Sequence, residues 1–381
     1  MLLRSSNSVF DNSGKVMTVK GPLDPEELGM TLMHEHLFFE SIMTTTRAPD
    51  INTPMMETKL WDDPLSVENL ALIGVLANGN RYGAFRNKDS SILADLDLAV
   101  EEISEFRNQG GASIVDVTNI GIRRDPISLM KVSMRTGLNI IAGSSWYVKA
   151  SHQSDMDFLT VEQLTDTIVQ DITVGIGDTG IRAGIIGEVG INGEPLTDNE
   201  IKIIKASARA SRKTGAPISL HWGGTGLEKM EVASLVSESG GEMCRTIFGH
   251  SDVSAGDFDL LLSLLEKGVY IQFDLLGRVG VPLSWDVLNK TSPWPEYLSF
   301  SGAAIVADTI NKLFSAGYGD RILISHDVCT KVQLKKFGGT GYSFIPEVFL
   351  PYLRRIGFTE EQLHLIMVEN PKRILTFVTP E

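Results

Sequence analysis

Two histidines flank a single glutamate in the stretch TLMHEHLF, residues 31 to 38. The apolar residues around them predict a β-strand, in which positions 34 and 36 share one face and Glu35 lies on the other. Two imidazoles that converge from one strand are placed to share a cation, because buried histidines without a partner are costly to desolvate. His34 and His36 are therefore candidate metal ligands, with a pair of hydrogen-bonded core histidines as the alternative.

Four more groups of the same chemistry lie at or near the carboxyl ends of later predicted strands. They are Glu188 in IIGEVG, His221 in SLHW, His250 in FGHSD and Asp327 in ISHDV. Taken singly, a strand histidine is usually structural, and an aspartate at a strand end often caps the next helix. Six such groups from five strands exceed the three protein ligands usual for one catalytic zinc, which favours two metal ions that share a carboxylate.

The elements that must position these groups are short apolar runs, each followed by a longer amphipathic segment. Predicted strands cover residues 29–38, 112–119, 139–148, 183–191, 217–222, 245–251, 269–277 and 321–327. Amphipathic stretches between them include 92–110, 160–172, 197–215 and 254–268. Eight strands that are mostly apolar on both faces and alternate with helices predict an α/β fold, a closed parallel (β/α)8 TIM barrel.

A doubly wound open sheet is the rival architecture. It would carry a glycine-rich phosphate turn after an early strand, and no G-x-G-x-x-G or Walker sequence occupies that position. We therefore expect a single barrel domain at residues 29–381, preceded by a strand or hairpin extension at 1–28 that closes its bottom. Long connections at 39 to about 90 and at 278–301 predict lids or pocket walls.

Composition limits the classes of partner. The formal net charge of −14 makes nucleic acid and anionic membranes poor partners. Cys244 and Cys329 lie far apart and form no CxxC motif, which argues against a disulfide framework or a cysteine-built zinc site. No stretch approaches about 18 unbroken apolar residues and the N-terminus is unlike a signal peptide, so we expect a cytoplasmic protein.

Several local phrases carry a resemblance to a known family. MHEHLFFE, AGIIGEVG, SHDVCTKVQLKKFGGTGYS and ENPKRIL are similar to phrases of the phosphotriesterase-related branch of the amidohydrolase superfamily, and the resemblance runs from about Gly21 to Phe377. It implies a (β/α)8 barrel that holds two divalent cations, usually zinc. Homodimers are also common among such barrels.

The resemblance assigns the ligands as well. It implies that His34, His36 and Asp327 hold the more buried metal, that His221 and His250 hold the more exposed one, and that Glu188 bridges both. In the phosphotriesterases proper the bridge is a carboxylated lysine, but RAGIIGEVGI contains no lysine and Glu188 stands at the matching place. This departure weakens any transfer of organophosphate activity.

Such a site predicts hydrolysis. A water shared by two cations loses a proton near neutral pH, and the resulting bridging hydroxide attacks a carbonyl or phosphoryl group that the more exposed metal polarises. Asp327, bound to one metal and close to the hydroxide, is the candidate to pass its proton to the leaving group.

Residues around the site have more open roles. Trp146 and Tyr147, which end the third strand, either line a substrate pocket or pack under the loop that follows. His152 in that loop is a candidate substrate contact or a solvated histidine. Arg278 begins the long seventh loop and is either a partner for an anionic substrate group or a surface arginine.

The leading hypothesis is a binuclear zinc hydrolase acting on a small carboxylic ester, lactone or N-acyl amide. The alternatives are a phosphoester or organophosphate hydrolase, and a protein that keeps its metals and binds a small molecule without turnover. A one-metal deaminase of the same superfamily is a further alternative, although those enzymes lack the carboxylate on the fourth strand.

Overall fold

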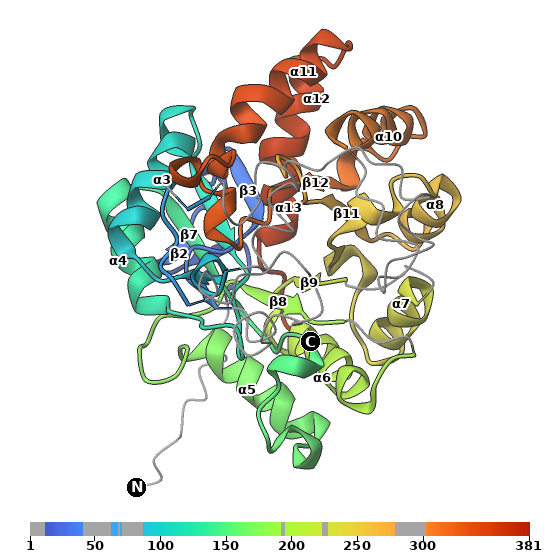
Figure 1. The fold of residues 1–381 in the computed structure, drawn as a ribbon. Coiled ribbons are helices and arrows are strands. Elements are labelled where there is room, and N and C mark those ends of the chain that lie inside the picture. Colours follow the sequence, from blue (N-terminus) through green and yellow to red (C-terminus); the bar gives the residue numbers. More distant parts are fainter. Residues whose placement is uncertain are drawn as a thin grey trace, which may run out of the picture.

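The computed structural model describes residues 12–40, 62–67, 69–70, 87–191, 195–222, 228–278 and 302–381. Within these residues eight parallel strands form one sheet in the order β12-β11-β10-β9-β8-β7-β6-β3, with helices packed around it (Figure 1). The barrel predicted from the alternation of strands and helices is confirmed. Most of the two long connections, at 39 to about 90 and at 278–301, lies outside the described residues.

Each observed strand lies inside its predicted range and is shorter than it. The barrel strands are β3 (Thr31–Glu35), β6 (Ser113–Asp116), β7 (Asn139–Ser144), β8 (Ile185–Val189), β9 (Ile218–Leu220), β10 (Thr246–Phe248), β11 (Tyr270–Phe273) and β12 (Ile322–Ile324). The main helices are α3 (Leu96–Asn108), α4 (Pro126–Thr136), α5 (Val161–Thr173), α6 (Asp198–Thr214), α7 (Lys229–Glu238), α8 (Phe258–Glu266), α10 (Ala303–Ser315), α11 (Leu350–Arg355), α12 (Glu360–His364) and α13 (Asn370–Leu375).

The barrel closes between its first and last strands through a few specific hydrogen bonds. The backbone N–H of Asp327 donates to the carbonyl of His34 at 3.1 Å. The N–H of His34 in turn donates to the hydroxyl of Ser325 at 2.9 Å. Residues that follow β12 are therefore fixed directly to the strand that carries the HEH motif.

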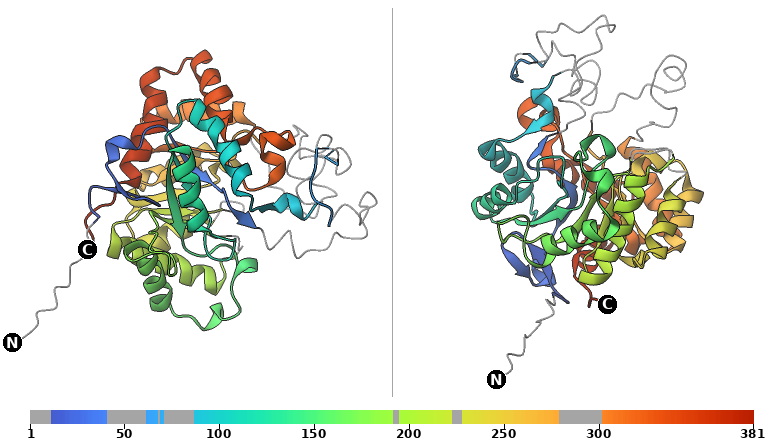
Figure 2. Two further views of the ribbon diagram at one scale, coloured as in Figure 1. Left: turned by 90° about the vertical axis from the view of Figure 1, so that its left-hand side faces the viewer. Right: turned by 90° about the horizontal axis from the view of Figure 1, so that it is seen from below.

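The lower half of the barrel interior is filled by apolar side chains, including Met33, Val115 and Ile141. An antiparallel hairpin, β1 (Val16–Thr18) with β2 (Gly21–Leu23), lies beneath them. Val16 packs into the interior cluster, and Val19 N–H donates to the carbonyl of Ile140 at 2.8 Å. The hairpin and the C-terminus lie at the same end of the barrel (Figure 2, left), which leaves the other end for chemistry.

Helix boundaries follow local sequence signals. Thr197 accepts the N–H of Glu200 and the Glu200 carboxylate accepts the N–H of Thr197, so a capping box begins α6. Gly215 ends α6 in the left-handed conformation that glycine adopts at little cost. Among the described residues, no helix has the length and apolar composition needed to cross a membrane.

Candidate metal centre

The six predicted ligands come together at the carboxyl end of the barrel. Their side chains are almost fully buried, and that of His221, the most exposed, is 12% accessible. Potential ligand atoms within 4.8 Å of one another form three groups, of which two contain predicted ligands only: His34 with His36 and Glu188, and Glu188 with His221 and His250. The third joins His34 and His250 to Asp274. Glu188 belongs to the first two groups, as the predicted bridging carboxylate would.

Glu188 lies at the centre of the four imidazoles. Its Oε1 is 3.2 Å from Nε2 of His36, and its Oε2 is 3.2 Å from Nε2 of His34. The same Oε2 lies 2.8 Å from Nδ1 of His221 and 3.9 Å from Nε2 of His250. One carboxylate thus faces one nitrogen of every histidine in the cluster.

Irregularities in the strand register turn the side chains of His34 and Glu188 into the barrel. On β3 the pairing with β6 shifts between Leu32 and Glu35, and on β8 the pairing with β9 shifts between Ile186 and Val189. Met33 packs in the barrel interior, so strict alternation beyond it would send His34 outward. A bulge re-aims the following side chain, which is its frequent role beside active sites.

Each histidine directs one ring nitrogen to the centre, and the other nitrogen contacts a partner outside the cluster. Nδ1 of His36 lies 2.9 Å from the Thr118 hydroxyl, and Nδ1 of His250 lies 2.7 Å from Oδ1 of Asp274. Nε2 of His221 lies 3.3 Å from the Tyr147 hydroxyl. Outer partners of this kind fix ring orientation and tautomer, as they do around metal-ligating histidines.

The outer partners of His34 come from β11 and the residue after it. Its Nδ1 lies 3.1 Å from the Gln272 amide nitrogen and 3.3 Å from Oδ2 of Asp274. Asp274 therefore contacts histidines of both ligand groups. The residue pattern did not indicate Asp274, Gln272 or Thr118 as partners of the histidines. The available signal was a carboxylate at the end of the strand YIQFD, the same place in its strand as the nominated ligands.

Asp327 joins the cluster through one carboxylate oxygen. Its Oδ1 lies 3.3 Å from Nε2 of His36 and 3.7 Å from Nε2 of His34. Its Oδ2 accepts a hydrogen bond from Arg278, which also donates to the Asp327 carbonyl at 2.9 Å. Asp327 and His250 have positive φ angles of 53° and 47°, a conformation sparsely populated by residues other than glycine and often found at functional sites.

The electrostatics of the cluster favour a cation. Burial by itself lowers the pKa of His34, but the carboxylates of Asp274 and Glu188 outweigh it and raise that pKa to about 9. For His36 burial again acts downward, and hydrogen bonds to Asp327 and Glu188 raise the pKa to about 10. Imidazoles that hold protons so strongly lie in a negative environment, where a metal ion would replace those protons.

The residues fit two metal ions. Nε2 of His34 is buried and makes no hydrogen bond of normal geometry with the described residues. Nδ1 of His221 and Nε2 of His250 are 2.8 Å apart and both face Glu188. Imidazole nitrogens and carboxylate oxygens in this combination are the donors that zinc takes in catalytic sites.

The remaining predicted contacts divide into two kinds. Tyr147 reaches the cluster, with its ring centroid 4.7 Å from that of His221. Trp146 is buried in the apolar core. His152 lies behind Tyr147, with Nε2 2.8 Å from the Tyr147 carbonyl, so it supports the loop. Arg278 contacts Asp327, as described above.

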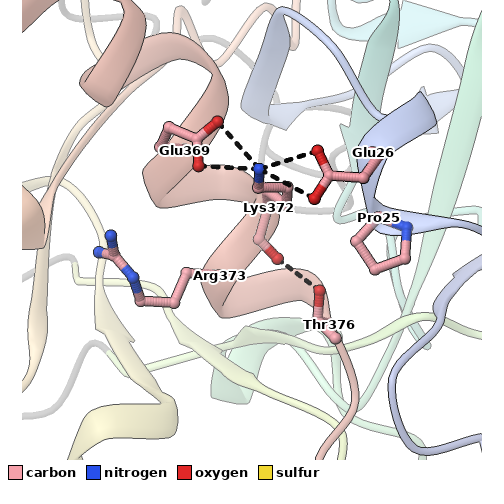
Figure 3. A pocket seen from close by; sticks show the side chains of 6 residues that line it. All are labelled: Pro25, Glu26, Glu369, Lys372, Arg373 and Thr376. Atoms are coloured by element: carbon pink, nitrogen blue, oxygen red, sulfur yellow. Dashed lines mark hydrogen bonds and ion pairs between the residues drawn. The ribbon is translucent and has the colours of Figure 1, made fainter.

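A surface hollow of about 370 Å³ lies at the opposite end of the barrel, between α13 and the turn after β2 (Figure 3). Lys372 at its centre is bound by the carboxylates of both Glu26 and Glu369. The Lys372 ammonium group is therefore already paired with two carboxylates, and the hollow adds nothing to the chemistry at the carboxyl end.

Known proteins are similar to this chain over most of their length. N-acetyltaurine hydrolase of Tetraodon nigroviridis is 35% identical over 96% of this chain and 99% of its own, and that of Dictyostelium discoideum is 34% identical over 96% and 98%. The crystal structure of a resiniferatoxin-binding protein from Rhodobacter sphaeroides superposes with a TM-score of 0.83, at 34% identity and 95% coverage of both chains. The model of the phosphotriesterase family matches residues 14–375. The chain therefore belongs to the phosphotriesterase family.

Proposed function

We propose that the protein is a metal-dependent hydrolase that cleaves the amide bond of a small N-acylated amine. The observation that carries the proposal is the position of Glu188, whose two oxygens face the histidines of both ligand groups. The similarity to N-acetyltaurine hydrolases at 34% to 35% identity supports an N-acyl amide ahead of an ester or lactone.

In this proposal His34, His36 and Asp327 would hold one divalent ion, His221 and His250 would hold the other, and Glu188 would be shared between them. Two such ions, most simply Zn²⁺, lower the pKa of a shared water and polarise a carbonyl oxygen when bound. The chain's own contribution is to orient six ligands and to supply groups that move protons and bind the substrate.

Asp327 is the proton acceptor in this scheme. Burial by itself would raise its pKa, but the Arg278 guanidinium beside it holds the pKa of that carboxyl below its usual value. The group is therefore ionised at neutral pH, and its Oδ1 faces the cluster while Oδ2 is bound to Arg278. Asp327 takes the proton of the attacking water and delivers it to the leaving nitrogen.

Tyr147 supplies a hydrogen-bond donor at the rim of the cluster. Burial raises the pKa of its hydroxyl well above the usual value, so the phenol keeps its proton. With a metal ion held at Nδ1 of His221, on the side that faces Glu188, Nε2 of that ring would carry the hydrogen and donate to Tyr147. The phenolic proton is then left for an oxygen or nitrogen of the substrate.

Arg278 is the proposed partner of an anionic substituent on the substrate. Its guanidinium lies against Asp327, and its buried Nε has no hydrogen-bond partner among the described residues. A sulfonate or carboxylate on the amine portion of the substrate would meet this cation. N-acetyltaurine and N-acetyl amino acids both carry such a group.

The test is hydrolysis by zinc-loaded protein of a panel containing N-acetyltaurine, N-acetyl amino acids, lactones, nitrophenyl acetate and a nitrophenyl phosphotriester. Release of primary amine from the N-acetyl compounds, abolished by chelation and restored by Zn²⁺, is the expected result. If only lactones, only esters or only phosphotriesters were cleaved, the proposed amide substrate would be wrong and the scissile bond would be of that class.

A binding protein without turnover is the second candidate. The observation in its favour is the 34% identity to the resiniferatoxin-binding protein over 95% of both chains. Elemental analysis accompanies the panel for this reason. Two metals per chain without turnover of any compound would favour this candidate. One metal per chain would instead favour a one-metal deaminase.

A further inference from the structure

The glutamate between the two histidines of the HEH motif makes an unusual set of contacts. Glu35 is fully buried, and its side chain leaves β3 on the side away from the ligand cluster. Its Oε1 accepts hydrogen bonds from the Ser325 hydroxyl at 2.7 Å, from His326 N–H at 2.9 Å and from His326 Nδ1 at 2.8 Å. Its Oε2 accepts the N–H of Val328 at 3.0 Å.

These contacts surround Asp327 without touching its side chain. The N–H groups of residues 326 and 328 both point at the Glu35 carboxylate, and the N–H of Asp327 between them bonds to the carbonyl of His34. Three consecutive backbone donors are therefore fixed by two consecutive residues of β3. Asp327 has its left-handed φ of 53° at the centre of this arrangement.

The hydrogen-bonding partners define the charge of the group. Nε2 of His326 accepts the N–H of Ile345 at 3.0 Å, so the ring proton lies on Nδ1 and is donated to Glu35. The Ser325 hydroxyl accepts the N–H of His34 and donates to Glu35. All four partners are donors, which only an ionised carboxylate satisfies in full.

We propose that Glu35 is a positioning residue for Asp327: its carboxylate holds residues 325–328 in the backbone conformation that directs Oδ1 of Asp327 at the histidines of the cluster. The proposal rests on the proposed function for its effect on turnover. Its effect on metal affinity depends only on Asp327 being a ligand. Glu35 itself contacts neither metal nor substrate.

Glutamine at position 35 is the sharpest change, because Glu35→Gln keeps the shape and replaces one oxygen by an NH₂ group. That NH₂ would face an N–H or imidazole donor, so at least one contact beside Asp327 is lost. The experiment is a double-mutant cycle with Asp327→Asn, in which Zn²⁺ affinity is measured by competition with a chelator. We expect each single change to lower affinity by about 10- to 100-fold, and the double variant to be no weaker than the weaker single variant.

Turnover gives a second readout with the same logic. At saturating Zn²⁺, Glu35→Gln should lower kcat by about 10- to 100-fold with little change in KM, and should cost almost nothing further in the Asp327→Asn background. Multiplicative losses in affinity and in kcat would show that Glu35 acts independently of Asp327. Unchanged affinity in Glu35→Gln would likewise overturn the proposal.

A milder variant covers the case in which Glu35→Gln does not fold. His326→Gln removes the imidazole donor and leaves the two backbone contacts of Glu35 in place. It should give a smaller loss of Zn²⁺ affinity that is again absent in the Asp327→Asn background. Additive losses in this cycle would contradict the assignment. If the wild-type protein turns over no compound, the hydrolase proposal fails while the affinity cycles still decide the role of Glu35.

Discussion

Oδ1 of Asp274 lies 2.7 Å from Nδ1 of His250, and the same carboxylate also accepts the backbone N–H of His250 at 3.0 Å. His250 is thus held at two points, its ring and its backbone, by one residue of the neighbouring strand end. Its Nε2 is left to face His221 and Glu188. Asp274 also contacts His34. This carboxylate, which the HEH motif does not predict, therefore supports ligands of both proposed metals.

Removal of this carboxylate should weaken metal binding. Asp274→Asn leaves His250 without its anionic partner, and we expect Zn²⁺ affinity to fall by about 10- to 100-fold. Asp308→Asn, at an exposed position on α10, is the control and should bind as the wild type does. Chelator competition measures both; equal affinities for the two variants would refute the supporting role of Asp274.

Loss of the Asp327 carboxylate should damage turnover more than substrate binding. We expect Asp327→Asn, assayed at a Zn²⁺ concentration that restores two metals per chain, to lower kcat by about 10²- to 10⁴-fold while KM changes little. Steady-state kinetics with metal analysis of the same sample give the answer. Full turnover in a metal-replete Asp327→Asn variant would exclude the proton-transfer role.

The Tyr147 hydroxyl should matter for catalysis and little for folding. Tyr147→Phe removes the proposed donor to substrate while its ring still packs against His221. We expect kcat/KM to fall by about 10-fold, in the range for one lost hydrogen bond, with an unchanged thermal midpoint. Tyr352→Phe on α11 is the matched control. A Tyr147→Phe enzyme with wild-type kcat/KM would remove the hydroxyl from the mechanism.

The metal-free protein should lose stability as pH rises from about 6.5 to 8. In the folded state the pKa values of His34 and His36 are raised to about 9 and about 10 by neighbouring carboxylates, against 6.5 when unfolded. Their protons therefore stabilise the fold fully below pH 6.5, and this contribution declines through the folded pKa values, by at most about 1.4 kcal/mol per pH unit for each group.

Lys229 sets the upper limit, about pH 8, of the range in which this loss of stability can be measured. Burial lowers its pKa to about 8, so its contribution rises with pH from there and offsets part of the loss. Urea denaturation with a chelator present, at pH 6.5, 7.2 and 8, measures the effect. Zinc-loaded protein is the reference and should lack the decline, since metal has replaced the two protons. A stability that increases with pH in the metal-free sample would contradict the assignment.

A side chain at position 184, at the bottom of the barrel, should destabilise the folded protein. A Cβ there would lie 2.1 Å from the Met17 carbonyl oxygen and 2.7 Å from Cγ2 of Ile141, so the hairpin would have to move. We expect Gly184→Ala to cost about 1 to 3 kcal/mol in the free energy of unfolding. Gly256→Ala, where nothing lies within 4 Å, should be close to neutral. Equal denaturation midpoints for the Gly184→Ala and Gly256→Ala variants would show that the hairpin is not packed against the residue that precedes β8.

Much of the fold could be predicted because each barrel strand is an apolar run flanked by polar residues. The cluster followed because parallel strands of a barrel end at one face, so groups such as Glu188 and His250 had to lie near one another. The residues that contact the outer nitrogens of the histidines were harder to predict from the sequence. Whether the aspartate of YIQFD contacts an imidazole depends on the stagger between β10 and β11, which the composition of either strand does not record.

The aromatic pair shows the same limit on a smaller scale. Trp146 and Tyr147 are adjacent and both aromatic, and one packs in the core while the other reaches His221. Alternation predicts that they diverge, but not which of them turns toward the ligands. His152 was open for a related reason, since a loop conformation set by several hydrogen bonds decides its contact with the Tyr147 carbonyl.

The shifted register on β3 and β8 has a consequence for engineering. A designed barrel that transplanted the six ligands onto ideally alternating strands would keep every residue type and spacing, yet turn His34 and Glu188 outward toward the helices. The extra residue in each of the two strands has to be transplanted with the ligands. Screening designs for the pairing of Glu35 with Asp116 and of Val189 with Leu220 would test for it before any metal is added.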